Sequence, residues 1–256
     1  MRTVYTFGGG STQDDLRARD KTVVGGKGAN LAEMASIGLP VPPGFTIATE
    51  ECLAYNAGGR TLGETLKAEI KRGIAHIEAA TGCRFGVPGG GVPLLVSVRS
   101  GARVSMPGMM DTVLNLGMDE QAVESLADTS GDARFAWDSY RRFIQMYADV
   151  VMGVDHGLFE EALEIAKEDA GVSLDTDLGE CDLSDLSRRY KAIVREETGA
   201  EFPDDPWDQL FGAIGARKLA SAAIAASKSS AATAAAAFGS AASSASISAF
   251  SAGSGV

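Results

Sequence analysis

The sequence predicts an α+β fold with a separate helical portion. Residues 1–118 combine short apolar runs, bounded by glycine and proline, with amphipathic helical segments, whereas residues 119–200 keep a helical spacing throughout. At residue 217 the composition changes abruptly, because 27 of the last 40 residues are alanine or serine. We therefore expect an α/β portion at 1–118, a helical subdomain at 119–200, a return to the first portion at 201–216 and an Ala/Ser-rich tail at 217–256.

The first portion opens with a glycine-rich stretch and a helix. "GKGANLAEMASIG" predicts a helix that ends at Gly38, with Pro40 beyond it. In "GFTIAT", Phe45 and Ile47 alternate with smaller residues, which predicts a half-buried strand.

A longer helix and a buried strand complete this portion. Thr61 and Glu64 have the spacing of a capping box, and a helical stripe follows that ends at Gly82. The members of the stripe are Leu62, Leu66, Ile70, Ile74 and Ile77. "PLLVSVRSG" then predicts a buried strand whose end meets a loop.

Three- and four-residue spacings predict the helices of the second portion. One buried face is expected from Phe135, Tyr140, Phe143, Ile144, Tyr147 and Val151. Leu158–Ala170 and Leu183–Val194 are two further amphipathic segments. "EFPDDPW" predicts a loop, and "WDQLFGAIGA" the helix after it.

The tail has no apolar stripe that a helix could bury. Alanine favours helix only weakly, and serine competes for backbone hydrogen bonds. We therefore expect residues 217–256 to be poorly packed or disordered.

Composition is typical of a globular protein kept in the cytoplasm. Of the 256 residues 45% are apolar and 22% charged, no apolar run approaches a membrane span, and the N-terminus lacks the order of a signal peptide. Cys52, Cys83 and Cys181 are widely spaced and without nearby histidines, so we expect reduced structural thiols rather than a disulfide framework or a metal site.

The net charge of −11 argues against a nucleic-acid partner. The tail contains three basic residues and no acidic one, so residues 1–216 hold 34 acidic against 20 basic residues. Any anion that this chain binds must therefore lie in a local basic pocket.

Two glycine-rich segments contain the cations suited to such a pocket. Lys27 lies among Gly25, Gly26 and Gly28, where backbone N–H groups and a helix dipole favour a phosphate, although the spacing is not that of a P-loop. Arg99 ends a strand, and its planar fork suits bidentate phosphate contacts.

Glycines after Arg99 extend this candidate site. Gly101 and Gly108 would let the backbone approach a polyphosphate closely, because they lack Cβ. The residues alone leave alternatives open: Lys27 as a solvated turn residue, Arg99 as half of a surface ion pair, and "MPGMMD" as core filler.

Four long segments carry a resemblance to a known family. "GGKGANLAEMASIGLPVPPGFTI", "LLVSVRSGARVSMPGMMDTVLNLG", "FAWDSYRRFIQMYADVVMGV" and "PWDQLFGAIGA" resemble the N-terminal nucleotide-binding region of the pyruvate, phosphate dikinases, from about Val4 to Ala216. The resemblance implies part of an ATP-grasp-type fold with an inserted helical subdomain. It also implies a full-length enzyme, a homodimer, that converts ATP, phosphate and pyruvate to AMP, pyrophosphate and phosphoenolpyruvate through a phosphohistidine.

The resemblance also implies roles for the residues of the glycine-rich segments. Lys27 and Arg99 match the family's phosphate-holding lysine and arginine, Gly108 falls in its glycine loop, and Gly101 follows the matched arginine. ATP and Mg²⁺ are the implied cofactors, with the Mg²⁺ ligands expected in a part of the family sequence that is not found here.

The matching sequence ends before the family's catalytic histidine. His76 is expected to be a partly buried structural residue and His156 a helix-entry residue, so we assign no catalytic residue and no metal ligand, and we expect this chain alone to be inactive. The composition break at 216–217 suggests a reading-frame change. The alternatives are a fragment similar to phosphoenolpyruvate synthase, or a non-catalytic gene remnant or interaction module.

Overall fold

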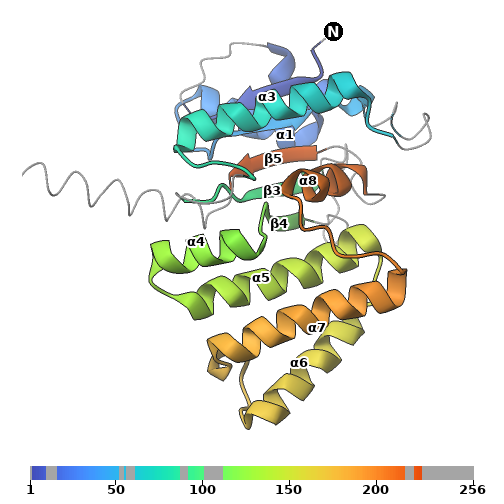
Figure 1. Cartoon of the computed structure of the whole chain (residues 1–256). Coiled ribbons are helices and arrows are strands. Elements are labelled where there is room, and N and C mark those ends of the chain that lie inside the picture. The colour runs from blue at the N-terminus through green and yellow to red at the C-terminus, as the bar shows by residue number, and fades with distance from the viewer. Residues whose placement is uncertain are drawn as a thin grey trace, which may run out of the picture.

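The computed structural model describes residues 2–9, 16–51, 55, 61–86, 92–100, 112–216 and 222–226 (Figure 1). One end of the molecule is built around a sheet, and the other end consists of stacked helices. The strands are β1 (Val4–Phe7), β2 (Gly44–Ile47), β3 (Val96–Ser100), β4 (Thr112–Leu116) and β5 (Ala222–Ala226). The helices are η1 (Leu16–Arg19), α1 (Lys21–Ser36), α3 (Glu64–Thr81), α4 (Glu120–Ser130), α5 (Ala133–Tyr147), η2 (Ala148–Met152), α6 (His156–Ala170), η3 (Asp175–Asp177), α7 (Glu180–Thr198) and α8 (Pro206–Gly215).

The described strands form one antiparallel sheet in the order β1-β2-β5-β3-β4. Together with the helices it confirms the predicted α+β class. The position of β5 corrects the expectation of a disordered tail, because Ala222–Ala226 forms an interior strand of the sheet. β2 and β3 offer hydrogen bonds on both sides of this strand, and Ile224 is fully buried. Pairing with strands distant in the sequence thus makes Ala222–Ala226 a strand, although its alanine-rich composition does not favour one.

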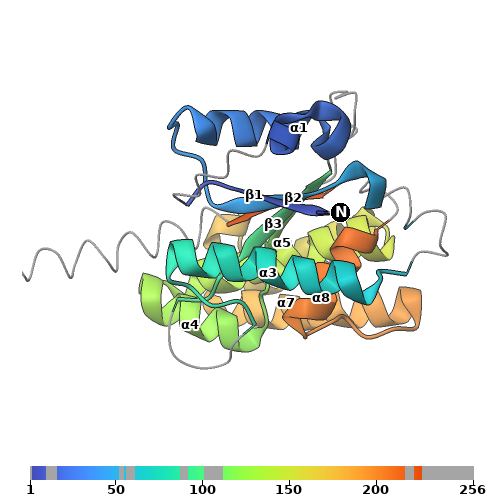
Figure 2. The same cartoon turned by 90° about the horizontal axis from the view of Figure 1, so that it is seen from above.

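The pairing register separates the two faces of the sheet. Phe45 of β2 pairs with Ile224 of β5, and Ile224 pairs with Val98 of β3. Directly paired residues point to the same face, and all three belong to the main core. Figure 2 shows α3 on one face of the sheet and α1 on the other.

β2 differs from the half-buried strand that its alternation predicts. All four of its residues are buried, because α1 covers the face that carries Thr46 while α3 covers the face that carries Phe45. In the sequence, the small side chains on the α1 face of β2 look like those of a strand face exposed to solvent. In the structure they allow α1 to pack closely against the strand.

α3 confirms the predicted stripe but not the predicted cap. Leu66, Ile70, Ile74 and Ile77 are buried, and the helix ends at Gly82, which is left-handed. The first member of the predicted stripe, Leu62, instead precedes the helix and is half-buried. Gly63, rather than Thr61, is the N-cap, and no side chain caps the helix. The capping-box prediction was therefore wrong.

The helical portion has the predicted segments, but two residues of its predicted buried face are not fully buried: Val151 is half-buried and Phe135 is exposed. The aromatic and aliphatic residues in the middle of α5 are buried, but Phe135 at its start is 39% exposed. Phe135 lies in the first turn of the helix. Asp119, Asp132 and Asp155 cap α4, α5 and α6 by accepting hydrogen bonds from backbone N–H groups.

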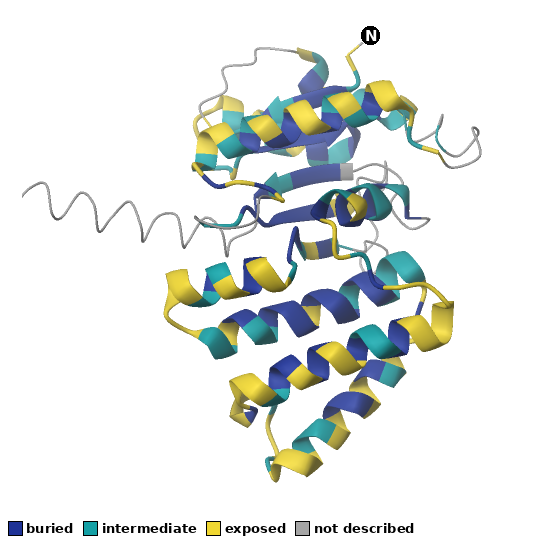
Figure 3. Cartoon of the chain, in the orientation of Figure 1, coloured by how far each residue is buried: buried dark blue, intermediate teal, exposed yellow. Residues whose placement is uncertain are grey.

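α8 returns the chain to the sheet through a buried glutamine. The Gln209 side chain accepts a hydrogen bond from Gly117 N and donates to the carbonyl oxygens of Met118 and Pro203. One hydrophobic cluster runs from Val4 to Ala226 through both portions. Figure 3 shows the buried residues continuing from the sheet into α5. The division at 118 and 200 stays a prediction.

Candidate functional site

The candidate site begins at a kink inside α1. The sequence predicts a loop before the helix, but Lys21–Val24 is already helical, and the helix is interrupted at Gly25, which has φ 73° and ψ 167°. Glycine adopts this conformation without the steric penalty of a Cβ. A helix that restarts after such a break directs its first N–H groups toward the break and gives them a positive partial charge. Lys27 lies in that first turn.

Gly28 fixes the second part of α1 on the sheet. A Cβ at this position would lie 2.7 Å from Thr46 Cγ2 and 2.9 Å from Thr46 Oγ1. Gly28 thus brings the helix backbone against β2 more closely than any other residue would. The Thr46 Oγ1 is buried and has no hydrogen-bond partner in the described part of the chain.

A row of paired residues links Thr46 to Arg99. Thr46 pairs with Ala223 of β5, Ala223 pairs with Arg99 of β3, and Arg99 pairs with Thr112 of β4. Their side chains therefore share the face of the sheet that α1 covers. Ala223 is buried and small, so β5 places no bulk between Thr46 and the exposed Arg99.

The two predicted cations are electrostatically coupled. Partial burial, and after it the Arg99 guanidinium, lowers the pKa of Lys27. Neither residue is paired with a carboxylate within the described ranges, so the ion-pair alternative for Arg99 finds no support there. Two neighbouring cations, one in the first turn of a helix and one on a strand, disfavour each other until an anion neutralises them.

The remaining predicted residues are distributed differently. Gly101 and Gly108 lie outside the described residues, as does Cys52. Cys83 is buried, which raises the pKa of its thiol, whereas Cys181 is exposed and departs from the expectation of packed thiols. His76 is partly buried on α3, and His156 is an exposed first residue of α6, both as predicted.

Thr46 and Ala223 are the residues of this face that sequence reasoning missed. Thr46 could have been suspected from sequence, because it is a polar residue at the centre of the strand segment "GFTIAT". No local pattern could have indicated Ala223, because its position beside Arg99 results from pairing between segments more than a hundred residues apart.

The described residues contain neither a metal-binding cluster nor a membrane-spanning helix. No group of three or more His, Cys, Asp or Glu side chains that could hold a metal ion occurs within the described ranges. Of the helices described, none has the length and apolar character needed to cross a bilayer.

Comparison with known proteins identifies relatives of this chain. Residues 21–80, which include the kink, Lys27 and Gly28, match the family described as "Pyruvate phosphate dikinase, AMP/ATP-binding domain". The pyruvate, phosphate dikinase of Rhizobium meliloti (strain 1021) is 55% identical over 213 residues, which are 83% of this chain and 23% of the relative.

Similar proteins occur in other organisms. The chloroplastic pyruvate, phosphate dikinase 1 of Arabidopsis thaliana is 54% identical over 216 residues, and the enzyme of Clostridium symbiosum is 49% identical over 214. These alignments cover 84% and 83% of this chain but 22% and 24% of the relatives. The chain thus spans about a quarter of the length of the curated relatives it matches.

Proposed function

Since the chain is homologous to the N-terminal ATP-binding region of the pyruvate, phosphate dikinases, we propose that it binds the phosphates of ATP between the kink of α1 and the end of β3. Lys27 and Arg99 would hold the phosphates, and Gly101 and Gly108 would let the backbone approach them. The observation that carries the proposal is the convergence of two cations without a carboxylate partner among the described residues.

Each group has a distinct part in the binding. The backbone N–H groups that follow Gly25 are suited to bind one phosphate. They are fixed hydrogen-bond donors at the N-terminal end of the restarted helix, which has a positive partial charge. Arg99 suits bidentate contact with a second phosphate, and Lys27 supplies a compact charge between them. In phosphoryl transfer, such positioning and charge neutralisation account for most of the catalysis.

Magnesium fits the described residues less well than ATP does. Mg²⁺ is held by one or two carboxylates together with substrate phosphates, and no carboxylate of the described ranges pairs with Lys27 or Arg99. We therefore propose that this chain binds ATP weakly, with little dependence on Mg²⁺.

The activity of the complete relatives is a further proposal for this chain. Their names imply phosphoryl transfer involving pyruvate and phosphate, and we propose that this region supplies the ATP site for that reaction. We also propose that the chain alone does not complete the reaction. One of its two histidines lies on α3, on the opposite face of the sheet from α1 (Figure 2), and the other begins α6 at the helical end of the molecule (Figure 1). Its location in the cytoplasm stays a prediction.

Titration calorimetry with ATP, with and without Mg²⁺, tests the site. We expect Lys27→Ala and Arg99→Ala each to weaken binding roughly tenfold or more, because each removes a charge-assisted hydrogen bond. Arg188→Ala is the matched control, since this arginine is exposed on α7 and pairs with Asp185. Equal affinity in all four proteins would place any ATP site elsewhere, and tight binding only with Mg²⁺ would contradict the proposed metal independence.

A further inference from the structure

A groove between α6 and α7 lies at the end of the molecule farthest from the sheet (Figure 1). Its volume is about 560 Å³. α7 packs against α5 on its inner side, whereas α6 packs mainly against α7. The groove is therefore separate from the proposed ATP site in both sequence and space.

The floor of the groove is apolar and buried, and an apolar residue at its edge is open to solvent. Leu186 and Ile193 of α7 are 3% and 5% exposed, and Ala162 of α6 is 9% exposed. Ile165, also on the lining, is 52% exposed. Ile165 thus joins the half-buried Leu158 and Ala166, also on the lining, in an apolar strip rimmed by polar residues, which suits contact with another apolar group.

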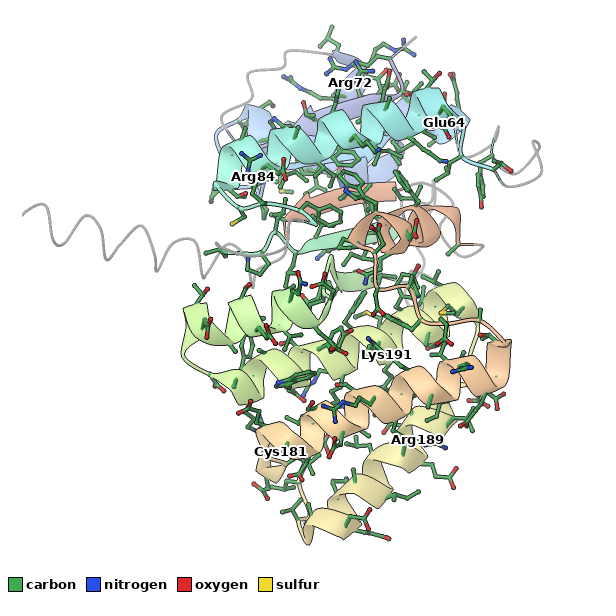
Figure 4. The ribbon with its side chains drawn as sticks, viewed as in Figure 1. Glu64, Arg72, Arg84, Cys181, Arg189 and Lys191 are labelled. Carbon is green, nitrogen blue, oxygen red and sulfur yellow. The ribbon has the colours of Figure 1, made fainter. Side chains whose placement is uncertain are left out.

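The rim of the groove is strongly acidic. Six of the fourteen lining residues are acidic, against 34 of 256 in the whole chain, so the enrichment is local. They are Glu161, Asp169, Asp182, Asp185, Glu196 and Glu197. Arg189, labelled in Figure 4, is the one cation of this lining, and it forms an ion pair with Glu196 at 2.9 Å.

We propose that this groove binds a basic amphipathic helix of another protein. A narrow apolar stripe would cover Ile165 and the floor, and flanking lysines or arginines would face the carboxylates on both rims. α6 has 15 residues and is therefore about 22 Å long, so a helix of about 15 residues would match the groove. The charge of the rim selects against an acidic helix with the same apolar stripe.

Fluorescence anisotropy with synthetic helical peptides and the full chain tests the proposal. The first probe has about 15 residues, with leucines on one face and lysines beside them, and the second has the same leucines with glutamates in place of the lysines. We expect the lysine peptide to bind at least ~10-fold more tightly, and 0.5 M NaCl to weaken its binding several-fold. Equal binding of the two peptides would overturn the proposal.

Variants of the chain locate the binding surface. Ile165→Asp, and the combined Glu161→Gln and Asp169→Asn substitutions, should each weaken lysine-peptide binding ~5-fold or more. The matched control is Glu124→Gln with Asp128→Asn on α4, two exposed carboxylates outside the groove, which should bind as the parent does. If the control lost as much affinity for the lysine peptide, the loss would result from the change in net charge alone, and the proposal that the peptide binds in this groove would be overturned.

Two further readouts separate the proposal from other causes. Circular dichroism should show unchanged helicity in Ile165→Asp, because half of this side chain is already exposed, and ATP binding should be unaffected. Light scattering reports self-association: a dimer of the parent that Ile165→Asp dissociates would assign the groove to a second copy and overturn the proposal of a heterologous helix.

Discussion

At the residue scale, the contact between Gly28 and Thr46 controls the position of Lys27. We predict that Gly28→Ala destabilises the fold by roughly 1–3 kcal/mol, because its Cβ would lie 2.7 Å from Thr46 Cγ2 and force α1 away from β2. Urea denaturation measures this change, and the displacement of Lys27 should also weaken ATP binding.

Gly26→Ala is the matched control for this prediction. No atom lies within 4 Å of a Cβ built at Gly26, so the substitution should be neutral, or stabilising by up to about 1 kcal/mol through helix propensity. Thr46→Ala in the Gly28→Ala background should restore part of the stability, since it removes the two nearest atoms. Equal effects of the two glycine substitutions would disprove the packing argument.

Tyr140 gives the stability a dependence on alkaline pH. Burial raises its pKa to about 12 from an ordinary value of 10.0. Both states keep the proton below pH 10, but between pH 10 and 12 the unfolded chain loses it first, so stability falls as pH rises. The loss is on the order of 1–3 kcal/mol. Denaturation midpoints at pH 8 and pH 11 should differ less in Tyr140→Phe than in the parent chain; an unchanged difference would contradict the assignment.

At the element scale, β5 joins the two halves of the sheet. Ile224 is fully buried between Phe45 and Val98, and β5 supplies the hydrogen-bond partners of both β2 and β3. We predict that Ile224→Ala costs about 2–5 kcal/mol, and that a chain ending at Ala216 fails to fold cooperatively.

A chain ending at Lys228 is the control, because it keeps β5. It should melt within a few degrees of the parent and bind ATP equally well. If instead the chain ending at Ala216 were as stable as the one ending at Lys228, β5 would make no contribution to stability, and the prediction would be wrong.

At the scale of the whole molecule, one hydrophobic core predicts one unfolding transition. The core cluster includes residues of the sheet, α5, α7 and α8, and the Gln209 side chain connects α8 to the β4–α4 junction. The two tryptophans report on different ends: Trp207 packs against Phe85 near the sheet, and Trp137 against Tyr140 among the helices.

Single-tryptophan variants measure this cooperativity. The fluorescence midpoints of Trp137→Phe and Trp207→Phe in urea should each coincide with the midpoint from circular dichroism of the same variant. A helical portion that unfolds at a different urea concentration from the sheet would show instead that the predicted division at residues 118 and 200 separates independent folding units.

Sequence by itself determined the local elements of this protein. The stripe from Leu66 to Ile77, the ending at Gly82, and the helices at α6, α7 and α8 follow from periodicity and caps, which act over a few residues. Lys27 and Arg99 could also be proposed as phosphate ligands from sequence, because cations beside glycines suit an anion, and their role stays a prediction.

Only the tertiary structure decided which segments share a face. The alternation around Thr46 predicts a half-buried strand, but α1 covers that face because Gly28 permits a close approach. The composition of the tail predicts disorder, yet Ala222–Ala226 pairs with two strands and places Ala223 between Thr46 and Arg99. These outcomes depend on pairing and packing between residues distant in the chain, whose free energies no local pattern contains.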